Sequence, residues 1–488
     1  MKKIKIILVF LGSVFLINGC NESDLELTNP NQLSPETFFK NESQVQASVN
    51  AIYANLQTIG LYTRHMFFMM DNMAHENTGN PQLEADKVEY SNFSFDSSHG
   101  GIGDYWNSCF RGINKANFVL GNQEAINAIP ESFLTQAKKD KYIGEAKFLR
   151  ALYYFYLVPR FGDVPLITEI PEGGNGVARS PKEEVYQQII TDLQEASSVL
   201  LDKGSEEIGR ATKGAAYALL GKVYLYQQNY SAALEAFNNV TGYTLEADYQ
   251  DNFLEETEHG PESIFEVEYN DDLGDGAKWN SNVSGAGPNE VTFRGQEYGM
   301  FDWFNVYPAD NLLDEYENGD IRFDETFYVV GDTTGAGAAI TSIANDRRAG
   351  WRKYQNYYKD LNEDQASGIN MKVLRYADVL LMMAESANEV QDQATAIGYI
   401  NQVRERAELP DLATSLSKQQ VFDAIVHERK VELAGEQVRF ADLVRWGMAN
   451  EVLGPFGFQS GKSELLPIPD SEISSNENVN AADQNPGY

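Results

Sequence analysis

Apolar residues recur every three to four positions over residues 214–245, the spacing of one face of an α-helix. The apolar face that includes Tyr224 ends at a polar turn, residues 228–230, and a second apolar face begins after it. The stretch therefore predicts two consecutive helices. Gly221 on the first helix and Ala233 on the second are small, so we expect the two helices to approach closely.

The same order of apolar and small positions returns in residues 377–408. This order and spacing resemble a tetratricopeptide repeat, a helix pair that stacks on its neighbours. Two weaker copies pair residues 45–56 with 105–126, and residues 144–158 with 182–200. Because three or more such repeats are needed to bury a continuous core, we predict about four helix pairs that form a scaffold.

Residues 245–370 lack helical periodicity and are rich in Gly, Asn, Asp and aromatic side chains. Short apolar runs at residues 263–267 and 326–330 predict small strands there. Long irregular segments inside an ordered chain often carry function. The predicted fold class is mostly α, with few short strands. Its helical repeats span approximately residues 45–60, 105–240 and 371–447, and its loop-rich half spans approximately residues 61–104 and 245–370, with a tail at 448–488.

The chain begins with three lysines among its first five residues, followed by a short apolar run at residues 6–17. This run is shorter than the roughly 20 apolar residues of a membrane-spanning helix, so it is typical of a secretory signal. Ile17-Asn18-Gly19-Cys20 resembles a bacterial lipobox. We predict a lipoprotein signal peptide over residues 1–19, acylation of Cys20, and one domain over residues 20–488.

Acidic residues outnumber basic ones, 72 against 38, which gives a formal net charge of −34. Nucleic-acid-binding proteins concentrate Lys and Arg, so this charge argues against a nucleic-acid partner. With Cys20 acylated, Cys109 is the one remaining cysteine and no intrachain disulfide can form. We expect the folded state to depend on its core, which a hydrophobic content of 42% can build.

The usual catalytic motifs are incomplete in this sequence. His427-Glu428 begins like a zinc protease motif, but the second histidine is missing. The glycines of residues 100–103 lack the strand before them and the helix after them that a dinucleotide site needs. Leu273 stands where a calcium loop over residues 271–276 would need an oxygen ligand. Carboxylates are abundant, but nothing singles out a glycosidase pair. We predict no enzymatic activity, no metal and no cofactor.

Several motifs occur in a fixed order along the chain. They are the lipobox, AKFLRALYYF at 146–155, RFGDVPL at 160–166, RYADVLL at 375–381, the charged helix at 428–447, LPIP at 466–469 and NPGY near the C-terminus. Together they resemble the SusD/RagB family of outer-membrane nutrient-binding lipoproteins of Bacteroidetes. The resemblance covers essentially the whole chain.

This resemblance implies a SusD-like fold in which four tetratricopeptide-type units pack against an irregular ligand-binding half. It also implies a lipid anchor in the cell outer membrane, exposure at the cell surface, and a SusC-like TonB-dependent barrel transporter as partner. Acidic residues just after Cys20 resemble the export tag of surface lipoproteins in these bacteria. The charged residues of the 428–447 motif are expected to form buried ion pairs that hold the architecture.

Sugars present C–H faces that pack on aromatic rings and hydroxyl groups that need polar partners. We therefore look for aromatic residues beside polar ones in the loop-rich half, while Trp106 and Trp446 lie in helical motifs and are interpreted as core. The candidate ligand-binding residues are Trp303, Trp279, Tyr298, Phe301, Trp351, Tyr354, Asp71, Asn72, Tyr90 and Phe93.

Two ligand classes fit this pattern. The first is an oligosaccharide or polysaccharide, expected to be neutral, which the protein delivers to the transporter. The alternative is a peptide, bound by a member of the same family that caps a peptide transporter, although extended peptides favour sheet edges over flat aromatic surfaces. A third interpretation, a helical scaffold for protein docking, is compatible with either.

Overall fold

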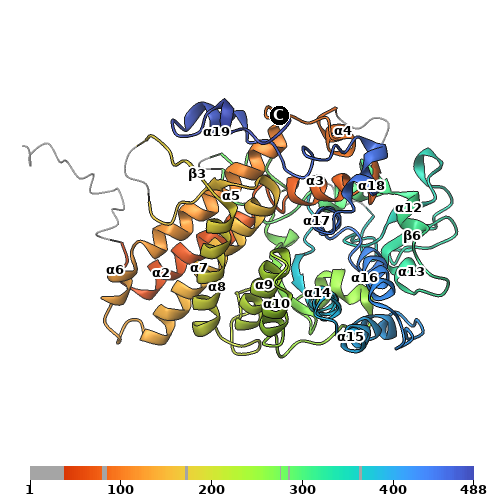
Figure 1. The fold of residues 1–488 in the computed structure, drawn as a ribbon, viewed down its shortest axis with the longest axis horizontal. Coiled ribbons are helices and arrows are strands. Elements are labelled where there is room, and N and C mark those ends of the chain that lie inside the picture. Colours follow the sequence, from red (N-terminus) through yellow and green to blue (C-terminus); the bar gives the residue numbers. More distant parts are fainter. Residues whose placement is uncertain (1–37, 80–84, 171–173, 275, 284–285, 362–364) are drawn as a thin grey trace, which may run out of the picture.

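The computed structural model describes residues 38–79, 85–170, 174–274, 276–283, 286–361 and 365–488. Helices dominate these ranges and pack in pairs, and loops and four small two-stranded sheets fill the remainder (Figure 1). The predicted signal peptide and Cys20 lie outside the described residues.

Four helix pairs form a continuous scaffold, as predicted. They are α2 (Glu42–Ala54) with α5 (Gly100–Leu120), α7 (Gln136–Phe161) with α8 (Lys182–Val199), α9 (Lys213–Tyr226) with α10 (Tyr230–Phe237), and α14 (Tyr376–Glu389) with α15 (Gln393–Arg406). Each pair also contacts the next, because α5 packs on α7, α8 on α9, and α10 on α14. Figure 1 shows this series running from α2 across to α15.

Local sequence signals set where these helices begin and how closely they pack. The side chain of Asn41 accepts a hydrogen bond from the backbone of Gln44 at the start of α2, and Thr212 caps α9 in the same way. A Cβ atom at Gly221 would lie 2.4 Å from the ring of Phe237. The close contact of α9 with α10 therefore requires glycine at this position.

The loop-rich half contains small antiparallel sheets and short helices. The strand pairs are β1 (Asn77–Gly79) with β5 (Val306–Pro308), β4 (Ser263–Val267) with β8 (Met371–Arg375), and β6 (Phe327–Val329) with β7 (Ala349–Trp351), while β2 (Val164–Pro165) pairs with β3 (Arg179–Ser180) beside the helices. The short helices are α11 (Arg294–Tyr298), α12 (Asp310–Leu313) and α13 (Arg322–Thr326), with α6 (Gln123–Asn127) between α5 and α7. The two predicted strands are thus present as β4 and β6.

Residues 61–104 differ from the expectation of loops, because they contain α3 (His65–Met73) and α4 (Ala85–Asn92). Every residue of α3 is buried, so its sequence has no polar face to give a helical period. The tail is also partly helical. Within residues 448–488 it contains α18 (Ala449–Leu453) and α19 (Asp470–Ser475). Two helices precede the tail, α16 (Lys418–Glu432) and α17 (Arg439–Arg445), and they lie in the predicted helical range 371–447.

Buried ion pairs join the helices to one another and to the loop-rich half, as the charged motif predicted. Arg429 pairs with Asp378 at 2.8 Å and with Asp442 at 2.7 Å. Arg322 of α13 pairs with Glu428 of α16 at 2.6 Å. Within the described ranges, none of the helices is both long and apolar enough to cross a bilayer.

Candidate functional site

Two tryptophans form an exposed aromatic surface in the loop-rich half. The rings of Trp279 and Trp303 are stacked with 21° between their planes and 6.2 Å between their centroids. Trp279 is 48% exposed and Trp303 is 40% exposed, although large aromatic side chains are usually well buried. We call this pair, with Phe301, the aromatic platform.

The backbone around α11 holds Trp303 in place. The N–H of Trp303 donates to the carbonyl of Gln296 at 3.2 Å, and the N–H of Asn305 donates to the carbonyl of Glu297 at 2.9 Å. The amide side chain of Asn305 donates to the Glu297 carboxylate at 2.6 Å. Because α11 is entirely buried, Trp303 lies on a fixed segment although it is in a loop.

Trp279 is supported from below by a cation and by a second ring. The guanidinium carbon of Arg64 lies 4.6 Å from the Trp279 ring centroid, within cation–π range. Arg64 is itself fixed by an ion pair with Glu297 at 2.5 Å. The ring of the buried residue Phe293 packs on Trp279, with 4.2 Å between the ring centroids. Glu297 therefore links the two halves of the platform, since it binds both Arg64 and Asn305.

Phe301, the third residue of the aromatic platform, lies two positions before Trp303 in the chain and is 42% exposed. Its ring packs edge-on against Tyr357 at 5.1 Å, and its N–H donates to the Tyr357 hydroxyl at 3.0 Å. That hydroxyl donates in turn to the carboxylate of Asp302 at 3.0 Å. Asp302, directly before Trp303, and Asn305, two residues after it, are half-buried polar side chains of the same segment.

The structure places the other candidates in the interior, which corrects the expectation that they face a ligand. Tyr298 is buried, its hydroxyl donates to Asp71 at 2.9 Å, and the guanidinium carbon of Arg294 lies 3.2 Å from its ring centroid. Trp351 is also buried, and its indole N–H donates to Asn77 at 2.9 Å. These aromatic residues close the core of the loop-rich half, so they are not part of the proposed ligand surface.

The remaining candidates are buried for similar reasons. Tyr354 packs on Phe253 at 5.0 Å, and Phe93 packs on Phe458 at 5.4 Å. Tyr90 is buried beside His99, with 4.6 Å between the rings. Asp71 and Asn72 lie on the fully buried helix α3.

Burial also changes the pKa of Asp71 on α3. Removal from water raises the pKa of the Asp71 carboxyl, although Arg294 and the hydroxyl of Tyr298 oppose this shift. We assign this buried carboxyl to the internal hydrogen-bond network, in which it also accepts from the backbone of Gln437 at 3.0 Å.

Sequence reasoning missed Arg64, Phe293 and Glu297, which support the aromatic platform from beneath. Arg64 precedes α3 and is far from Trp279 along the chain, so no local pattern points to their contact. Trp106 is buried as expected, whereas Trp446 is only half-buried and lies under the guanidinium of Arg445 at 4.7 Å. Within the described ranges, no three His, Cys, Asp or Glu side chains are grouped to hold a metal ion.

Comparison with known proteins identifies relatives along the chain. Residues 261–458 match the family model described as the SusD family, and residues 25–225 match one described as starch-binding, associating with outer membrane. A SusD-like protein of Formosa agariphila is 30% identical, and the match covers all of both chains.

Solved structures agree with these matches. A laminarin-binding SusD-like protein is 30% identical with a TM-score of 0.79, over 92% of this chain and 100% of that one. A SusD superfamily protein from Bacteroides vulgatus is 26% identical with a TM-score of 0.81, over 93% of this chain and 100% of that one. The full-length match at 30% identity, the two family models and the shared fold show that this chain belongs to the SusD family.

Proposed function

We propose that this protein is a surface-exposed outer-membrane lipoprotein that binds a neutral oligosaccharide or polysaccharide on the aromatic platform. It passes this glycan to a SusC-like TonB-dependent transporter and does not cleave it. The observation that carries the proposal is the exposed, nearly parallel pair Trp279 and Trp303, held from below by Arg64 and Phe293.

The platform has the chemistry of a carbohydrate surface. Its rings supply flat apolar faces on which the C–H faces of a sugar can pack, and their supports keep them in place before a ligand arrives. Asn305, half-buried and two residues after Trp303, offers its amide oxygen to a sugar hydroxyl group. A fixed site loses less conformational entropy on binding, which favours affinity.

The relatives support a carbohydrate ligand. One matching family is described as starch-binding, and one related structure is described as laminarin-binding. They do not support the peptide alternative. The family description that includes association with the outer membrane also supports the proposed location.

Attachment to the membrane is proposed to depend on Cys20, which lies outside the described residues. Replacing Cys20 with Ala should move the protein from the membrane fraction to the soluble fraction of cells, because the acyl chains that hold it at the membrane would no longer be attached. Mass spectrometry of the wild-type protein should show the acyl groups. Membrane retention of the Cys20→Ala variant, together with an unmodified wild-type Cys20, would contradict this anchor.

The ligand is tested by screening the soluble body, which lacks residues 1–20, against a panel of neutral oligosaccharides that includes starch and laminarin fragments. At least one should bind saturably in a calorimetric titration. Chromatography after overnight incubation should recover that oligosaccharide intact. Shorter products that persist in a repurified sample would contradict binding without turnover, and failure of every neutral glycan to bind would contradict the ligand class.

A further inference from the structure

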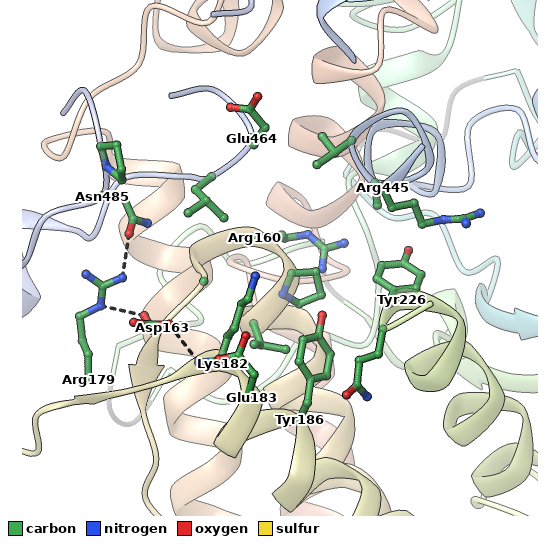
Figure 2. A pocket seen from close by; sticks show the side chains of 18 of the residues that line it. Arg160, Asp163, Arg179, Lys182, Glu183, Tyr186, Tyr226, Arg445, Glu464 and Asn485 are labelled. Carbon is green, nitrogen blue, oxygen red and sulfur yellow. Dashed lines mark hydrogen bonds between the residues drawn. The ribbon is translucent and has the colours of Figure 1, made fainter. Parts of the chain in front are cut away.

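A cavity of about 900 Å³ lies where the ends of several helices meet the C-terminal segment, away from the aromatic platform. Its walls come from the C-terminal end of α7, the N-terminal end of α8, the end of α9, α17 and residues 464–486 (Figure 2). None of the platform residues lines it. The volume lies within the range of about 300–1,000 Å³ that small-molecule sites occupy.

Arg160 lines this cavity and has no carboxylate partner within 4 Å among the described residues. Its Nε contacts the Met70 sulfur at 3.3 Å, and its Nη1 donates to the carbonyl of Tyr156 at 3.1 Å. A guanidinium has five N–H donors, so these two contacts leave most of its hydrogen-bonding capacity unused. Arg160 lies in the last turn of α7, where the partial negative charge of the helix dipole compensates part of its positive charge. The helix end supplies no counter-ion.

Arg445 lines another wall of the same cavity and, unlike Arg160, is paired with carboxylates. It pairs with Glu385 and, at 2.9 Å, with Asp442, so its charge is neutralised internally. Most buried arginines of the fold are paired in this way, Arg322, Arg375 and Arg429 among them. An unpaired arginine facing a cavity stands out in a chain whose net charge is −34.

Two tyrosine hydroxyls add polar groups to the same cavity. Tyr186 of α8 and Tyr226 of α9 line it, and neither hydroxyl has a hydrogen-bond partner in the described part of the chain. Figure 2 shows both hydroxyl ends directed to the side of the cavity on which Arg160 lies. Apolar side chains, including Pro159, Phe440 and Leu465, form other parts of the wall.

The other charged side chains of the cavity limit the net charge of a ligand that can bind there. Arg179, which donates to the carbonyl of Asp163 and to Asn485, and Lys182 at the exposed rim are further cations. Asp163, Glu183 and Glu464 also line the cavity. Asp163 accepts from the backbone of Lys182 at 2.9 Å, and Glu464 accepts from the backbone of Gly461 at 2.9 Å. These carboxylates would repel a ligand with several negative charges, so the arrangement favours one anionic group.

We propose that this cavity is a second binding site, for a small hydroxylated carboxylate of the uronic acid class. The ligand carboxylate pairs with the guanidinium of Arg160, in the charge-assisted geometry that arginine favours. Ligand hydroxyl groups bond to Tyr186 and Tyr226, and the apolar wall packs on the C–H face of the ring. This site is independent of the aromatic platform and of the glycan proposed to bind there.

The test is a calorimetric titration of the soluble body with glucuronic and galacturonic acid, and with glucose and acetate for comparison. One of the two uronic acids should bind saturably. Glucose should bind at least tenfold more weakly because it lacks the carboxylate, and so should acetate because it lacks the hydroxyl groups. Absence of saturable binding by both uronic acids, or equal binding of acetate, overturns the proposal.

Substitutions of cavity residues test whether the uronic acid binds in this cavity. Arg160→Lys should weaken uronic acid binding at least tenfold, because the bidentate contact is lost. Tyr186→Phe and Tyr226→Phe each remove one hydroxyl group and should weaken uronic acid binding about fivefold. Melting temperatures show whether the variants stay folded. Trp303→Ala should leave uronic acid binding unchanged, and Tyr186→Phe should leave neutral glycan binding unchanged. Wild-type affinity for the uronic acid in both folded tyrosine variants overturns the assignment to this cavity.

Discussion

Arg375, the last residue of β8, donates to the carboxylate of Glu432, the last residue of α16, at 2.5 Å. The same guanidinium pairs with Glu262 beside β4 at 2.6 Å and with Glu436 at 2.7 Å. All four side chains are buried. This cluster ties the β4–β8 sheet of the loop-rich half to the last long helix.

Arg375→Met should therefore lower the free energy of unfolding strongly. Removing one partner of a buried ion pair leaves uncompensated charge, which costs about 3–5 kcal/mol. The matched control is Arg348→Met, because Arg348 makes an exposed pair with Asp314, which is worth about 0–1 kcal/mol. Urea unfolding measures both variants, and equal losses would contradict the structural role of the Arg375 cluster.

Stability in acid should depend on Glu266 of β4. Burial alone would raise the pKa of its carboxyl, but the Lys372 ammonium and His259 outweigh this and lower the pKa from 4.5 to about 2. A lowered folded-state pKa contributes stability that is present above pH 4.5 and is lost as the pH falls toward about 2. Glu266→Gln should therefore flatten the fall in unfolding free energy across this window.

The matched control for this pH experiment is Glu184→Gln, because Glu184 is exposed on α8. Urea unfolding at a series of pH values from 6 down to about 2 gives the slope for each protein. Glu184→Gln should keep the wild-type slope. A Glu266→Gln variant with the same slope as wild type would show that the Lys372 pair does not hold this carboxylate ionised.

Cys109 of α5 should be inert in the folded protein. It is buried, and burial raises the pKa of its thiol well above the ordinary range, so the reactive thiolate is scarce. In the soluble body lacking residues 1–20, a thiol reagent should label no cysteine in buffer and one in denaturant. Rapid labelling in buffer at an unchanged melting temperature would contradict the burial of this side chain.

The helix pairs could be predicted because apolar residues at a helical period report directly on a local structure. Helix α3 could not, since all of its residues are buried and the period disappears. Loop composition indicated correctly that aromatic residues gather in residues 245–370, but it could not separate exposed rings from buried ones. Trp351 and Tyr298 lie in the interior because distant residues such as Asn77 and Asp71 cover them.

The supports of the aromatic platform depend on contacts between distant segments. Arg64 reaches Trp279 and Glu297 across more than 200 positions of the chain, so its role appears only in the folded molecule. The cavity around Arg160 has the same origin. It forms where α7, α8, α9 and the C-terminal segment meet, although each segment alone is typical of a structural element.

The most direct test of the account compares Trp303→Ala with Trp351→Ala, using the neutral glycan that the wild-type protein binds. Trp303 is exposed, so its removal should cost roughly 1–3 kcal/mol of binding, a ten- to hundredfold loss of affinity, at an unchanged melting temperature. Trp351 is buried, so its removal should cost about 3–5 kcal/mol of stability. Wild-type affinity in folded Trp303→Ala protein would contradict the claim that the aromatic platform binds the glycan.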